Sequence, residues 1–152
     1  MDVPLRQRLE DDLKVAMKAG DQTGRDTIRF TLAALKNAEI EKGGSLSSDE
    51  AIALLQREAK RRADSIDQFR AGKREDLVAR ETAQLEVLQR YLPAAMGEEE
   101  LGSLVAAVIA ETGATGPRDM GRVIPIVLQR AAGRADGRRV SGAVRSALSG
   151  TP

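Results

Sequence analysis

The chain has 152 residues and contains no cysteine, histidine or tryptophan. This composition excludes disulfide bonds, Cys/His zinc sites and every mechanism in which histidine is the general base. The 24 Lys and Arg residues almost balance the 23 Asp and Glu residues, so the net charge of +1 identifies no charged partner by itself.

Four helices are expected in the first part of the chain, because apolar residues recur there every three or four positions. Their expected ranges are 4–20, 21–42, 47–72 and 74–92. The first range shows the pattern most clearly, with an apolar stripe made of Leu5, Leu9, Leu13 and Met17. Ser47 and Glu50 have the spacing of a capping box, in which each side chain accepts a hydrogen bond from the other residue's backbone amide.

A domain boundary is expected at Pro93–Gly97, because Pro93 ends a helix and no apolar periodicity crosses this segment. Three shorter helices are expected after it, at 98–112, from Gly116 to the turn at Gly133–Gly137, and from that turn to the end of the chain. Pro125 falls inside the second of these helices and is expected to kink it.

No segment alternates apolar and polar residues long enough to indicate a strand. The sequence therefore predicts an all-α fold in two domains. An N-terminal helical bundle of about four helices is expected at residues 1–95, and a small three-helix C-terminal domain at residues 96–152.

The N-terminal residues Met1-Asp2-Val3-Pro4 lead directly into a charged helix. They lack the apolar core of a signal peptide, and no later stretch has the length and apolarity of a membrane span. We therefore expect a cytoplasmic protein that does not bind membranes.

Charge is distributed unevenly along the chain. Residues 1–112 hold 17 Lys and Arg against 21 Asp and Glu, whereas residues 113–152 hold 7 against 2, which gives net charges of −4 and +5. All seven late cations are arginines, namely Arg118, Arg122, Arg130, Arg134, Arg138, Arg139 and Arg145. Arginine suits bidentate contacts with phosphate, and the glycines and helix N-terminus at Gly133–Gly137 suit anion binding. These seven arginines are the predicted RNA-binding residues, although a GC-rich gene would also favour arginine over lysine.

Aromatic residues are nearly absent. The three in the chain, Phe30, Phe69 and Tyr91, all precede the expected C-terminal domain. Proteins that read single-stranded RNA stack its bases on aromatic side chains. We therefore expect this domain to contact phosphate, ribose and the shape of the RNA.

Two other charged features have ordinary structural explanations. The acidic clusters lie at expected helix N-termini or on polar faces, where they complement the helix dipole. The basic run Arg57, Lys60, Arg61 and Arg62 fits a solvated helix face or an anionic partner. No opposed carboxylate pair or calcium-loop spacing is present, so we expect no catalytic residues, no cofactor and no metal site.

Five stretches carry a resemblance to a known family, in order along essentially the whole chain. They are Ile28–Glu41, Arg57–Arg62, Tyr91–Pro93, Asp119–Val123 and Gly133–Val140. In these stretches the chain resembles the GatB/YqeY family, and specifically its free-standing YqeY-like members. The last two, Asp-Met-Gly-Arg-Val and Gly-Arg-Ala-Asp-Gly-Arg-Arg-Val, are the most specific.

The resemblance implies that the chain acts together with transfer RNA. YqeY-like proteins are similar to the C-terminal helical and tail domains of the B subunit of the glutamine-dependent aminoacyl-tRNA amidotransferase. The family is associated with carbon–nitrogen ligase activity, with glutamine as amido donor. The resemblance extends this association to the chain as a related domain but assigns no catalytic residue, because the chain has no counterpart of the catalytic domain.

The resemblance thus predicts a tRNA-binding accessory protein of translation, and we expect it to be a monomer. Since no nucleophile–base pair can be assembled from its residues, we favour this role over an amidotransferase in its own right. The alternative is a protein-interaction module that docks on a tRNA synthetase or an amidotransferase.

Overall fold

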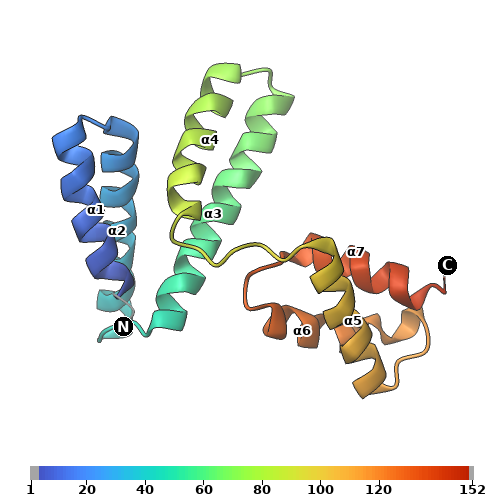
Figure 1. The fold of residues 1–152 in the computed structure, drawn as a ribbon. Coiled ribbons are helices and arrows are strands. Elements are labelled where there is room, and N and C mark those ends of the chain that lie inside the picture. Colours follow the sequence, from blue (N-terminus) through green and yellow to red (C-terminus); the bar gives the residue numbers. More distant parts are fainter. Residues whose placement is uncertain (1–3, 151–152) are drawn as a thin grey trace. The chain divides into compact units, whose positions relative to one another are not determined.

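The computed structural model describes residues 4–150, so Met1, Asp2 and Val3 of the expected N-terminal segment lie outside the described residues. Within residues 4–150 the chain forms seven α-helices and one 3-10 turn, with no strand (Figure 1). The prediction of an all-α fold is confirmed. The chain divides into two compact units, Met1–Leu92 and Pro93–Pro152, each of which is described by itself.

The N-terminal unit consists of α1 (Leu5–Ala19), α2 (Gln22–Lys42), α3 (Ser48–Ala71) and α4 (Glu75–Gln89). Glycine ends the first two helices in the left-handed conformation, with φ of 70° at Gly20 and 81° at Gly43. The capping box at the start of α3 is confirmed, because the Ser47 hydroxyl accepts from the Glu50 amide at 3.1 Å and Glu50 accepts from the Ser47 amide at 3.1 Å.

The core of the N-terminal unit draws apolar residues from all four helices. Its buried members are Leu9, Ile28, Leu35, Ala51, Leu54, Leu55, Val87, Leu88 and Tyr91. The stripe predicted for the first helix is wrong at its end, since Met17 is 51% exposed while Ala16 is 6% exposed. Residues four apart drift by about 40° around a helix at each step, so a stripe at that spacing leaves the core after three steps. Ala16, seven residues after Leu9, returns to the buried face.

Tyr91 fastens the end of α4 to α1. Its buried hydroxyl donates to the Asp12 carboxylate, and the Arg8 guanidinium lies 5.1 Å from the centre of its ring. Burial is the main cause that raises the pKa of Tyr91 above its ordinary value, followed by the bond to Asp12. Helix α4 ends before Arg90, earlier than expected. The contacts of Tyr91 nevertheless keep this part of the chain packed in the N-terminal unit.

The basic run on α3 is largely paired within the N-terminal unit. Lys60 lies 3.5 Å from Asp64, and Arg61 pairs with Glu58. Arg62 is mostly buried and joins α3 to α4, donating to Glu81 at 3.1 Å and to Gln84 at 2.5 Å. These partners explain most of the run without an external anion.

The C-terminal unit consists of α5 (Glu98–Thr112), η1 (Pro117–Asp119), α6 (Met120–Ala131) and α7 (Gly137–Leu148). The expected second helix thus begins as a 3-10 turn, and α6 continues through Pro125 to Ala131. Valines fill much of the core between the three α-helices, and Val108, Val123, Val127, Val140 and Val144 are each 0% exposed. The seven predicted RNA-binding arginines lie outside this core, on the surface of the C-terminal unit.

Candidate nucleic-acid interface

All seven predicted RNA-binding arginines lie in the C-terminal unit, and the structure divides them into two groups. Four form ion pairs with acidic side chains of the same unit, namely Arg122, Arg130, Arg134 and Arg139. The other three, Arg118, Arg138 and Arg145, are exposed and form no ion pair with any acidic side chain of residues 4–150. We call these three the open arginines.

Arg134 acts as a cross-link inside the unit. Its guanidinium makes a bidentate pair with Glu100 on α5, at 2.7 and 2.9 Å, and its Nε donates to the Ala94 carbonyl at 2.8 Å. The Met96 amide donates in turn to the Arg134 carbonyl at 2.8 Å. Arg134 therefore holds the segment before α5 against the turn after α6, a role that local sequence patterns do not reveal because these partners are 34 to 40 residues away.

Arg130 and Arg139 connect other pairs of helices. Arg130 on α6 forms a bidentate pair with Glu111 on α5, at 3.0 and 2.6 Å, and Arg139 on α7 donates to Glu98 at 3.3 Å. The hydrogen bonds between Arg130 and Glu111 raise the pKa of the arginine and lower that of the carboxyl group. Because these pairs face solvent, each contributes little to the stability of the unit.

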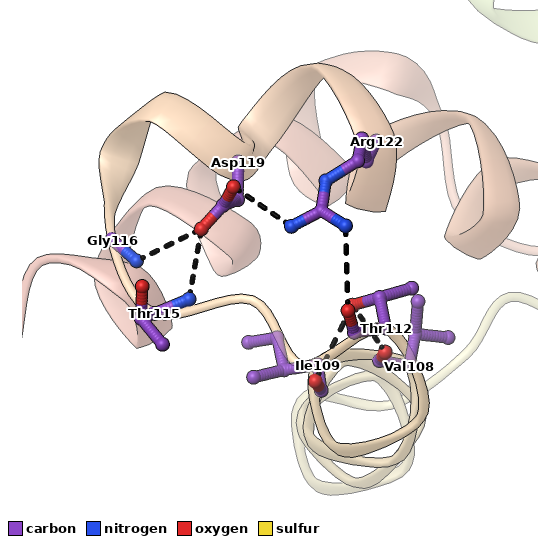
Figure 2. Close-up of polar contacts among 7 residues, drawn as sticks. All are labelled: Val108, Ile109, Thr112, Thr115, Gly116, Asp119 and Arg122. Atoms are coloured by element: carbon purple, nitrogen blue, oxygen red, sulfur yellow. Dashed lines mark hydrogen bonds and ion pairs between the residues drawn. The ribbon is translucent and has the colours of Figure 1, made fainter.

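Arg122 completes a network around Asp119 in the loop that joins α5 to α6 (Figure 2). One Asp119 oxygen accepts from the amides of Thr115 and Gly116, at 2.8 and 3.3 Å, and the other accepts from Arg122 at 2.8 Å. Arg122 also donates to the Thr112 carbonyl at 3.4 Å. The Thr115 amide, followed by Arg122, lowers the pKa of Asp119 to about 2. The Asp-Met-Gly-Arg stretch therefore shapes this loop.

The excess of positive charge seen along the sequence largely disappears at the level of the folded unit. The Pro93–Pro152 unit holds seven arginines against six acidic residues, a net charge of only +1. Four of these acids lie on α5, outside the stretch 113–152 in which the arginines are concentrated. Helix packing brings Glu98, Glu100 and Glu111 to arginines that are distant in sequence.

The turn at Gly133–Gly137 differs from the expected anion site. The Asp136 side chain caps α7 and accepts from the Arg139 amide at 2.8 Å. A carboxylate of the protein thus already occupies the helix N-terminus, where it would repel a phosphate. Any phosphate contact in this region falls to Arg138, which is exposed on the first turn of α7.

The open arginines gather around α7. Arg138 and Arg145 are seven residues apart on this helix, a spacing that places them on the same face. Arg118 lies on η1, which packs against α7. The helix residues Gly137–Leu148 include no acidic side chain, so no neighbour on the helix neutralises this face.

Residues 4–150 contain no cluster of three or more acidic side chains close enough together to hold a metal ion. No helix in this part of the chain has the length and apolar character needed to cross a membrane.

The fold and the arginine-bearing surface define a two-unit helical protein with a basic face on its last helix. The protein-family model described as "Yqey-like protein" matches residues 6–148, and the chain belongs to this family. It is similar to "Altered inheritance of mitochondria protein 41, mitochondrial" of Pyrenophora tritici-repentis, with 39% identity over 132 residues, 84% of this chain and 71% of that protein.

Proteins of the same name in two yeasts also match. The Saccharomyces cerevisiae protein is 39% identical over 85 residues, 55% of this chain and 46% of that protein. The Lachancea thermotolerans protein is 35% identical over 113 residues, 72% of this chain and 60% of that protein. All three relatives are named as mitochondrial proteins, and this contradicts the cytoplasmic location expected from the N-terminal residues. A signal-peptide pattern bears on secretion alone, so its absence carried no information about mitochondria.

Proposed function

We propose that this chain is a tRNA-binding accessory protein, related to the helical and tail part of the amidotransferase B subunit. The C-terminal unit makes the contact, and the open arginines Arg118, Arg138 and Arg145 are the residues that meet phosphate. One observation carries the proposal, which is that these three exposed cations have no acidic partner within residues 4–150.

The electrostatics favour these three over the other four arginines. An arginine that already pairs with a carboxylate must give up that partner before it binds a phosphate, whereas an open arginine exchanges only water. Arg122, Arg130, Arg134 and Arg139 are therefore assigned to the structure of the unit.

Salt dependence tests the proposal directly. Neutralising about three phosphates should give a slope of log affinity against log salt of roughly −2 to −3. Replacing Arg138 by glutamine should weaken binding of a tRNA pool and flatten this slope. Arg130→Gln is the matched control, because it removes an arginine of the same unit that is already paired with Glu111.

Two results would overturn the proposal. One is the absence of any tRNA complex at low salt, measured by fluorescence anisotropy with labelled tRNA. The other is an equal loss of affinity in the Arg130→Gln control, which would show that total charge matters and that the open arginines have no special role.

Docking on a tRNA synthetase or an amidotransferase is the second candidate function. It is favoured by apolar side chains exposed on the N-terminal unit, where Val15 is 65%, Phe30 57% and Ile40 68% exposed. A complex with either purified enzyme that survives nuclease and high salt, and that weakens on Phe30→Ser, would support this candidate. A complex lost on nuclease treatment would instead identify RNA as the bridge.

A further inference from the structure

The structure of the free protein does not explain why residue 142 is a glycine. Gly142 lies in the interior of α7, where glycine is less favourable than alanine because it loses more backbone entropy on folding. Its φ is not in the left-handed region that calls for glycine. A Cβ built at Gly142 would meet no heavy atom within 4 Å, so packing does not require glycine either. The described part of the chain thus contains no reason for glycine at this position.

The neighbours of Gly142 indicate what could approach it. Arg138 lies one turn before it and Arg145 about one turn after it, so the three residues form one ridge along the outer face of α7. The two arginines are separated by a rise of about 10 Å along the helix axis. The ridge therefore presents two open guanidinium groups on either side of a stretch of bare helix backbone.

Gly102 on α5 provides an internal comparison. It is an exposed helical glycine, whereas Gly142 is half-buried, and a Cβ at Gly102 would likewise meet nothing within 4 Å. Glu98 and Glu99 lie one turn before it, however, and α5 contains no Lys or Arg, so no cation of this helix attracts an anion to that face. A missing side chain between arginines suits the close approach of a phosphate backbone, and a missing side chain beside glutamates does not.

We propose that α7 receives the sugar–phosphate backbone of a double-stranded RNA stem, which crosses the helix at Gly142 between Arg138 and Arg145. This inference rests on the proposed function and names the form of RNA that the unit recognises. The absence of aromatic residues from the C-terminal unit excludes base stacking on aromatic rings, the usual means of holding single strands. Duplex RNA is bound through phosphates, 2′-hydroxyls and shape, which the arginines, serines and exposed backbone of this helix can contact.

The test uses the full chain and two RNA probes with equal numbers of nucleotides, a hairpin stem and an unstructured strand. The stem should bind the wild type more tightly. Gly142→Leu should weaken stem binding about tenfold, which corresponds to loss of one charge-assisted contact. Gly102→Leu, at the open glycine of α5, should leave the affinity unchanged. Thermal melting of both variants checks the fold, and Gly142→Ala should melt above the wild type because alanine is the better helix former.

The outcomes separate this inference from the proposed function. If neither RNA binds, the proposed function itself fails. If the protein binds RNA but does not prefer the stem, or if Gly142→Leu and Gly102→Leu weaken binding equally, the duplex-crossing inference is overturned while tRNA binding by the unit stands.

Discussion

The role of Arg134 can be tested by replacing it with methionine, which keeps the aliphatic stem and removes the guanidinium group. The substitution deletes the hydrogen bond from Nε to the Ala94 carbonyl and the bidentate pair with Glu100. A hydrogen bond from a charged donor contributes about 1.5 kcal/mol. The ion pair contributes about 0.5 kcal/mol, because its side chains are 33% and 50% exposed. Arg134→Met should therefore destabilise the C-terminal unit by about 2 kcal/mol.

Amide hydrogen exchange can locate this loss, since it reports the opening of each helix separately. A loss of about 2 kcal/mol should speed the exchange of the slowest amides in α5, α6 and α7 by roughly 30-fold. Amides in α1 to α4 should exchange at the wild-type rate, because they belong to the other compact unit. Arg138→Met is the control, since Arg138 is exposed and has no acidic partner within residues 4–150.

The two variants should behave in opposite ways. Arg134→Met should change exchange strongly and tRNA affinity little at temperatures where the unit stays folded, whereas Arg138→Met should lower affinity and leave exchange unchanged. The reasoning is refuted if Arg134→Met leaves the exchange of α5 to α7 unaltered and weakens tRNA binding as much as Arg138→Met does. Arg134 would then be an RNA contact, as the sequence alone predicted.

Two further predictions concern the backbone and the response to acid. Lys73 has φ of 58°, which is unfavourable for a residue with a Cβ, so Lys73→Gly should raise the free energy of unfolding by up to about 1 kcal/mol in urea titrations. A lower midpoint would show that the lysine side chain stabilises this turn. The pKa of Asp119 is lowered from 3.8 to about 2, so its contribution to stability is complete above pH 4 and is lost as the pH falls through 2. The stability difference between wild type and Asp119→Asn should therefore be constant above pH 4 and shrink below it in acid titrations, and a difference that stays constant down to pH 2 would contradict this assignment.

The helices were predictable because their signals are local. The Ser47–Glu50 capping box and the left-handed glycines Gly20 and Gly43 involve backbone groups within a few residues of each other, so the sequence contains all the information needed. The same holds for Asp136, whose side chain caps the helix that starts at the next residue. Local hydrogen bonding thus determines the ends of most elements without reference to the rest of the fold.

The candidate site was predictable only in part. The sequence identified the seven arginines, and their chemistry favours phosphate whatever the fold. It could not show which of them are open, because Arg130 meets Glu111 across 19 residues and Arg134 meets Glu100 across 34 residues. Such pairs depend on how three helices pack, and no periodicity in the chain reports that packing.

By itself, the sequence determined the helical class, most of the helix ends and the supply of arginine, since each follows from residue type and from contacts within one or two turns. Only the tertiary structure decided the distribution of charge. Packing α5 against α6 and α7 places three of its glutamates beside three arginines, which pairs those cations and leaves the open arginines without an acidic partner within residues 4–150. Coulomb attraction acts through space, and so the open face on α7 follows from the packing of helices that are distant in the chain.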